Sequence, residues 1–185
     1  LRDGGYYNNW DFDGALVSNY IKAMIDSKID VIEIGFRSLP GKSFKGPYYY
    51  STDYFLKKLK IPKSLKLAIM INANEWFCES NEATIKQISK YFIESNKSPL
   101  DLIRIAININ KYQDAKILVN TLKKLGYDIG LNLMQAHGKT KKDYKDIART
   151  IKSWASVDIL YFADSLGNMS PNEIKFICNS LKSEW

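Results

Sequence analysis

Short apolar runs alternate with longer amphipathic stretches along the whole chain. The apolar runs are rich in β-branched residues and recur about every 30 residues, a spacing typical of βα units. They are almost continuously apolar, as expected for parallel strands covered on both faces. The runs predict strands at Asp30–Phe36, Lys66–Asn72, Asp101–Ile107, Asp128–Met134 and Asp158–Ala163, and Leu1 is interpreted as the tail of a further, first strand.

The stretches between the runs carry apolar residues at spacings of three and four, which predicts helices. These are Asp13–Ser27, Thr52–Leu59, Asn81–Ser95, Lys111–Leu125, Lys141–Ser156 and Pro171–Lys182. Strands and helices alternating in this way form either an open doubly wound sheet or a (β/α)₈ barrel. No glycine-rich phosphate loop follows any strand, so we expect an α/β TIM barrel. Residues 1–185 hold about six of its βα units as one incomplete domain.

Polar residues stand near the ends of most predicted strands, where barrel enzymes build their active sites. They are Asp3, Arg37, Asn72, Asn108, Gln135 and Asp164. The loop from Arg37 to Ser51 is longer than an ordinary βα connection and is expected to cover a substrate. Asp164 has three open interpretations: it binds substrate, supports a metal, or orders its loop.

The chain opens with Leu-Arg-Asp-Gly-Gly. Glycine tolerates positive φ, so Gly4 and Gly5 are expected to turn the backbone sharply and let Arg2 and Asp3 converge. An Asp so placed can bind Mg²⁺ or Mn²⁺, and an Arg can bind a carboxylate or a developing enolate. The alternative is that Asp-Gly is only a turn signal.

Two charged residues lie within apolar strands, Glu33 in Val-Ile-Glu-Ile-Gly and Arg104 in Leu-Ile-Arg-Ile-Ala. Buried charges are costly unless they are paired, so both are expected to face the barrel interior and meet polar partners. Either they form an ion-pair network that holds strands together, or they orient Arg2 and Asp3. The residues alone leave both interpretations open.

Composition restricts the class of protein. The chain has 185 residues, 45% of them apolar and 25% charged, as in a globular domain. Its net charge of +7 comes without an arginine-rich stripe, so no nucleic-acid partner is expected. Cys78 and Cys178 stand apart and are interpreted as free thiols. No apolar run is long enough for a membrane span, and we expect a cytoplasmic protein with no membrane partner.

Four segments in order, LRDGGYYNNWDF, VIEIGFRS, NLMQ and YFADSLGNM, carry a resemblance that covers nearly the whole chain. The chain resembles the HMG-CoA lyase-like aldolases, specifically the 4-hydroxy-2-oxovalerate aldolase branch of the DRE-TIM metallolyases. The resemblance implies a (β/α)₈ barrel that uses Mn²⁺ or Mg²⁺ to make or break a carbon–carbon bond beside a carbonyl. It also implies a small oxo or hydroxy acid as substrate.

The resemblance assigns roles to individual residues. Arg2 matches the arginine that stabilises the enolate, Asp3 a metal ligand, and Glu33 the acidic residue that supports them. Tyr6 stands where the aldolases have a catalytic histidine, so the base or the substrate is expected to differ. Substrate-binding positions are expected at Arg37, Asn72, Arg104, Asn132, Gln135, Asp164 and Ser165.

The family's His-x-His metal ligands belong to a seventh strand, so the remaining ligands are expected beyond Trp185. The 185 residues alone are then expected to be inactive, and their open edges to be covered by association, as a homo-oligomer or edge to edge. The leading hypothesis is a lyase of the EC 4.1.3 type. The alternatives are a Claisen-type acyltransferase similar to isopropylmalate synthase, and a non-catalytic barrel fragment.

Overall fold

The computed structural model describes residues 1–185 and contains one parallel sheet of five strands in the order β1-β2-β3-β4-β5. The strands are β1 Val31–Phe36, β2 Lys66–Asn72, β3 Leu102–Asn108, β4 Asp128–Met134 and β5 Ile159–Ala163. Each strand therefore pairs with the next one in the sequence, the order of a (β/α) barrel wall. The predicted α/β fold and its five strands after Leu1 are confirmed.

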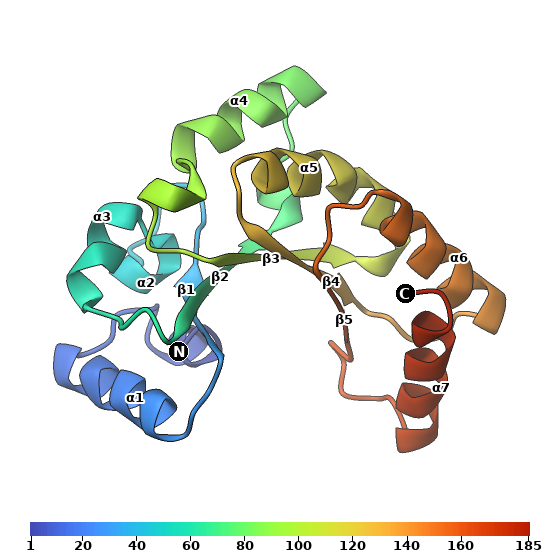
Figure 1. Cartoon of the computed structure of the whole chain (residues 1–185), viewed down its shortest axis with the longest axis horizontal. Helices are drawn as coiled ribbons and strands as arrows, with labels where there is room; N and C mark the ends of the chain where they lie inside the picture. The colour runs from blue at the N-terminus through green and yellow to red at the C-terminus, as the bar shows by residue number, and fades with distance from the viewer.

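The helices lie in an arc around one face of the curved sheet (Figure 1). The arc runs from α1 to α7 and leaves the opposite, concave face without a helix (Figure 1). The α-helices are α1 Gly14–Asp26, α2 Pro47–Tyr50, α3 Asp53–Leu56, α4 Asn81–Tyr91, α5 Lys116–Lys124, α6 Lys141–Ser153 and α7 Pro171–Lys182. The 3₁₀ helices are η1 Asp3–Tyr7, η2 Lys57–Leu59, η3 Ala73–Glu75, η4 Ser95–Lys97 and η5 Ile109–Ala115.

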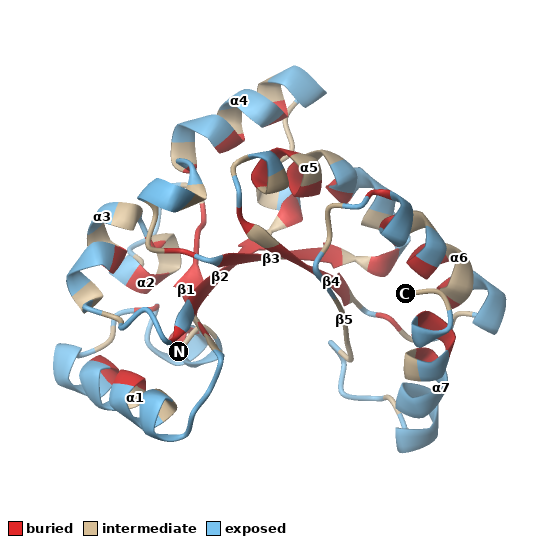
Figure 2. Cartoon of the chain, viewed as in Figure 1, coloured by how far each residue is buried: buried red, intermediate tan, exposed pale blue.

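The two faces of the sheet differ in chemistry. The outer face, under the helices, carries branched aliphatic residues that are at most 2% exposed: Ile32, Ile34, Ile69, Ile71, Ile103, Ile105, Ile107, Ile129, Leu131 and Leu133. Figure 2 shows this buried layer along the strands. Each such side chain contributes about 1.5–3 kcal/mol by leaving water. The concave face instead carries polar residues, among them Glu33, Asn72, Arg104, Asn108 and Asn132.

A bulge in β1 decides which of its side chains reach the concave face. Glu33 pairs with Ala68 and Gly35 with Ile69, so Ile34 has no partner on β2. Side chains alternate between faces along a strand, and one extra residue reverses the alternation. Phe36 consequently shares the concave face with Glu33, while Arg37 turns to the outer face.

Helix starts follow their capping residues. Asp13, Ser80 and Thr140 each accept a backbone N–H from the first turn of α1, α4 and α6. Ser170 and Glu173 form a capping box at the start of α7, with Pro171 in its first turn. No helix combines the length and the apolar character needed to cross a membrane.

Several sequence expectations were wrong in detail. Leu1 belongs to no strand, and the residues after it form η1 instead. Neither Gly4 nor Gly5 has a positive φ. Gly5 is required for a different reason: a Cβ there would lie 2.1 Å from Trp10 Cδ1. The expected helix over residues 81–95 ends at Tyr91, because Phe92 adopts an extended conformation.

Candidate active site

Arg2, Glu33 and Arg104 meet on the concave face of the sheet. Arg2 Nε donates to Glu33 Oε1 at 2.7 Å, and Arg104 Nη2 donates to the same oxygen at 2.7 Å. Arg104 Nε lies 2.7 Å from Glu33 Oε2. Glu33 is on β1 and Arg104 on β3, so this pair crosses β2, where the small Ala68 stands beside Glu33. One carboxylate thus holds two guanidinium groups from distant parts of the chain.

The Arg104 guanidinium also contacts the aromatic ring of Tyr161 on β5. The Arg104 Cζ atom lies 5.4 Å from the centre of the Tyr161 ring. Gly130, the β4 residue in register with Arg104, makes this contact possible. A Cβ on Gly130 would stand 2.9 Å from Tyr161 Cε2 and 3.5 Å from Arg104 Cγ. The absence of a side chain at this position therefore lets the two neighbours meet across β4.

Arg2 is fixed at three points. Besides its bond to Glu33, its carbonyl oxygen accepts a 2.9 Å hydrogen bond from Trp10 Nε1, and its Cζ lies 5.5 Å from the centre of the Phe36 ring. Its Nη1 is paired with Asp3, and its Nη2 makes no hydrogen bond within the chain. The planar guanidinium is thus oriented by Glu33 while keeping N–H donors for a carboxylate or an enolate oxygen.

The cluster holds two guanidinium groups and two carboxylates, the largely buried Glu33 and the exposed Asp3. The side chains of Arg2, Arg104 and Glu33 are 14%, 19% and 20% exposed, so two guanidinium groups share one carboxylate in a largely desolvated place. Burial raises the pKa of Tyr20 on α1, and the negative charge of Glu33 raises it further.

Asp3 is placed differently from the other charged residues. Its side chain is 80% exposed, and one of its oxygens is paired with Arg2. No group of three or more His, Cys, Asp or Glu side chains lies close enough together to hold a metal ion. Mg²⁺ and Mn²⁺ need several oxygen ligands. The residues of this chain therefore do not by themselves form a metal centre, and Asp3 is at most one ligand of such a centre.

The carboxyl ends of β3, β4 and β5 are joined by polar contacts. Asn108 Nδ2 donates to Gln135 Oε1 at 2.5 Å, and the Gln135 backbone N–H donates to Ser165 Oγ at 3.1 Å. Asn132 lies further inside on β4 and is 7% exposed. The structure thus brings Gln135 and Ser165 together at the rim, with Asn132 on the same concave face.

Asp164 orders the loop that follows β5. It accepts hydrogen bonds from the backbone N–H groups of Asn168 at 3.1 Å and Met169 at 2.8 Å. These bonds hold the pKa of Asp164 below its ordinary value. Of the three roles considered for Asp164, its contacts match the ordering of the loop between β5 and α7.

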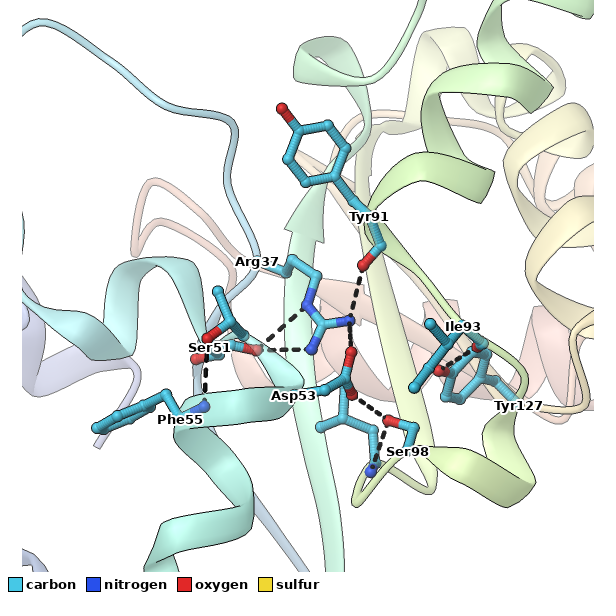
Figure 3. Close-up of polar contacts among 10 residues, drawn as sticks. Arg37, Ser51, Asp53, Phe55, Tyr91, Ile93, Ser98 and Tyr127 are labelled. Atoms are coloured by element: carbon cyan, nitrogen blue, oxygen red, sulfur yellow. Dashed lines mark hydrogen bonds and ion pairs between the residues drawn. The ribbon is translucent and has the colours of Figure 1, made fainter.

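Arg37 lies outside the cluster, on the helix-covered side of the sheet (Figure 3). Its Nε and Nη2 donate to the Ser51 carbonyl oxygen at 3.2 and 2.6 Å, and its Nη1 to Asp53 Oδ2 and the Tyr91 carbonyl oxygen, both at 3.2 Å. Phe92 covers the guanidinium at 4.7 Å. Burial lowers the pKa of Arg37, and Asp53 opposes this shift. The guanidinium is 3% exposed, so it binds its own chain, contrary to the expected contact with substrate.

A cavity of about 290 Å³ opens beside Arg2 at the carboxyl ends of β1 and β2. Tyr6 and Asn72, both singled out in the sequence, line it. The sequence pattern did not mark the six further lining residues as site residues: Trp10, Phe36, Ser38, Lys45, Tyr49 and Glu75. Three of them lie in the loop over residues 37–51, whose length was the available signal. Nothing in the pattern marked Glu75, which belongs to the short helix η3 after β2.

Comparisons with known proteins bear on this arrangement. A scan against protein-family models finds no match. A 4-hydroxy-2-oxovalerate aldolase from Pelotomaculum thermopropionicum is 25% identical over 177 residues, which are 94% of this chain and 49% of that protein. The N-terminal domain of a Bacteroides vulgatus protein assigned as an aldolase is 30% identical, with a TM-score of 0.78 over 98% of this chain and 58% of that one.

The chain resembles the HMG-CoA lyase-like aldolases. The HMG-CoA lyase of Bacillus subtilis has the same fold, with 10% identity and a TM-score of 0.64 over 95% of this chain and 59% of that one. The resemblance noted in the sequence is therefore confirmed, and the relatives are lyases that act on carbon–carbon bonds. The chain spans about half to three fifths of the length of these relatives.

Proposed function

We propose that the protein containing this chain is a divalent-metal-dependent aldolase that cleaves a 4-hydroxy-2-oxo acid into pyruvate and an aldehyde. The observation that carries the proposal is Arg2, held by Glu33 on the concave face with unused N–H donors. Its similarity to aldolases over most of its length supports the choice of reaction. A centre for Mn²⁺ or Mg²⁺ would take Asp3 as one ligand and the others from outside these 185 residues.

The proposed reaction needs a positive group that stabilises the developing enolate oxygen, and Arg2 can supply it. As the bond between C3 and C4 breaks, its electron pair moves toward the C2 oxygen and forms an enolate. A guanidinium aimed at that oxygen lowers the barrier, because it is already oriented when the charge develops. Glu33 and Arg104 act through Arg2: they fix its orientation and add a second positive charge for the substrate carboxylate.

Cleavage also requires removal of the proton on the C4 hydroxyl. We propose that the Tyr6 hydroxyl relays this proton to solvent, because Tyr6 lines the cavity beside Arg2 and is 65% exposed. Its ring packs on Trp10 with 4.8 Å between ring centres. The remaining expected substrate contacts are Gln135 and Ser165 at the rim and Asn132 further inside on β4.

The proposal is tested with a protein that includes this chain and the segments its relatives have in addition. Pyruvate release from 4-hydroxy-2-oxovalerate is measured with Mn²⁺, with Mg²⁺ and with EDTA. Metal-dependent release supports the proposal. Release of free thiol from acetyl-CoA and a 2-oxo acid, without pyruvate release, would instead indicate an acyltransferase. A folded protein that binds no Mn²⁺ by calorimetry would contradict metal dependence.

A further inference from the structure

The cavity beside Arg2 has aromatic walls. Tyr6, Trp10, Phe36 and Tyr49 line it, and their rings pack edge to face or tilted with 4.8 to 6.4 Å between centres. Trp10 and Phe36 are buried, at 4% and 8% exposure, and form the base of the wall. The cavity volume of about 290 Å³ is near the lower end of small-molecule sites.

Polar groups of three kinds stand between these rings. Asn72 Oδ1 accepts a hydrogen bond from the Asn74 backbone, which leaves its NH₂ group as a donor. The Lys45 ammonium lies 5.4 Å from the Trp10 ring centre and donates to Asn9 Oδ1 at 2.7 Å, so two of its three N–H groups stay available. Glu75 supplies acceptor oxygens. The cavity therefore offers donors and an acceptor around an aromatic wall.

The cavity adjoins the proposed reaction centre, because two of its lining residues also contact Arg2. Phe36 forms part of the wall and also contacts the Arg2 guanidinium, 5.5 Å from its ring centre. Trp10 forms another part and donates to the Arg2 carbonyl oxygen. A substrate whose enolate oxygen meets Arg2 would thus extend its C4 side into this cavity.

We infer that the cavity binds the aldehyde-derived part of the substrate, and that this part carries several hydroxyl groups, as a short sugar does. The inference rests on the proposed function. Hydroxyl groups both donate and accept, so they can satisfy Lys45, Asn72 and Glu75 together, whereas an alkyl chain would leave these groups unpaired. The C–H faces of a polyol would meanwhile pack on the aromatic wall.

Glu75 is suited to this task by its surroundings. Burial raises its pKa, while hydrogen bonds from Ser38 and the Leu39 backbone oppose the rise. A half-buried carboxyl group gains from a hydroxyl partner, because that partner replaces the water that burial removed. The same group would be unfavourable next to a methyl group.

The test runs the reaction toward condensation, with pyruvate and one aldehyde at a time. The aldehydes are D-erythrose, acetaldehyde and benzaldehyde, and consumption of pyruvate is followed. We expect kcat/KM for D-erythrose to exceed that for the other two by at least tenfold, roughly the net contribution of one or two hydrogen bonds. Preference for acetaldehyde or benzaldehyde would overturn the inference and leave the aldolase proposal intact. No consumption with any aldehyde would overturn the aldolase proposal itself.

Variants locate the effect in the cavity. Glu75→Gln and Lys45→Met are expected to raise KM for D-erythrose about tenfold, a loss of one hydrogen bond to a charged group, with little change in kcat. Their constants for acetaldehyde should stay the same. Glu79→Gln and Lys42→Met, both exposed and outside the cavity, are the matched controls. Equal losses for both aldehydes in the cavity variants would show a merely structural role and contradict the inference.

Discussion

Arg2 and Glu33, 31 residues apart in the chain, are joined by a 2.7 Å hydrogen bond between Arg2 Nε and Glu33 Oε1. This contact ties the irregular start of the chain to the first strand of the sheet. Because Glu33 also holds Arg104, the three side chains form one unit whose members depend on one another. The Glu33 carboxylate therefore contributes both to the stability of the fold and to the orientation of Arg2 for the proposed reaction.

Replacing Glu33 by Gln should destabilise the fold. The change leaves the largely buried Arg104 without its counter-charge and Arg2 with only the exposed Asp3, which costs about 3 kcal/mol at the low end of the range for buried pairs. Urea unfolding followed by tryptophan fluorescence measures the loss. Glu94→Gln is the control, because its pair with Lys97 is on the surface and worth at most about 1 kcal/mol. Equal stability of the two variants would show that the Glu33 network contributes nothing.

Gly35→Ala should destabilise the packing of α2 on the sheet. A Cβ at this position would lie 2.0 Å from the Tyr48 carbonyl oxygen, which is backbone and cannot swing away. We expect a loss of about 1–3 kcal/mol, as for other overpacked sites. Gly41→Ala meets no atom within 4 Å and serves as the control. Thermal unfolding of both variants checks the difference, and equal stability of the two would contradict the close packing of α2 on β1 at Gly35.

Arg37→Met should affect stability without affecting substrate affinity. The guanidinium holds Ser51, Asp53 and the end of α4 together, and its removal leaves Asp53 without its cation (Figure 3). The expected loss is about 3 kcal/mol. Under conditions where the variant stays folded, KM for the 4-hydroxy-2-oxo acid should be unchanged. A tenfold rise in KM in the folded variant would instead indicate that Arg37 contacts the substrate.

Asp164→Asn should change how stability depends on pH. The folded pKa of Asp164 lies below its ordinary value of 3.8, so its carboxylate stabilises the fold above that pH. This contribution is lost as the pH falls through the lower, folded value. The variant should therefore be less stable than the parent at pH 6 and approach it as the pH falls below the folded pKa of Asp164. Asp114→Asn, an exposed carboxylate without a hydrogen bond, should show no such difference.

The apolar, β-branched runs predicted the strands, and the polar residues within and after them predicted the polar side of the sheet. Glu33 and Arg104 could be paired in principle, because two opposite charges within apolar strands need partners, although β2 lies between their strands. Arg37 could not be placed. Strict alternation puts residues 33, 35 and 37 on one face, and only the bulge at Ile34 sends Arg37 to the other side.

The start of the chain shows a second limit of the pattern. Leu-Arg-Asp-Gly-Gly predicted the meeting of Arg2 and Asp3 but not the 3₁₀ helix that brings it about. That helix depends on Gly5 fitting against Trp10, a contact made through tertiary packing. The position of Glu75 beside the cavity could not be predicted for the same reason, because the cavity is formed by three separate segments of the chain.

The most direct test of the account compares pyruvate release by the parent protein and by Arg2→Met. Both contain the segments additional to this chain, and both are shown to be folded by circular dichroism. We predict metal-dependent release by the parent and a fall in kcat/KM of about 10²- to 10³-fold in the variant, as when one donor to a developing oxyanion is lost. Unchanged release by Arg2→Met would contradict the central claim that Arg2 serves the reaction.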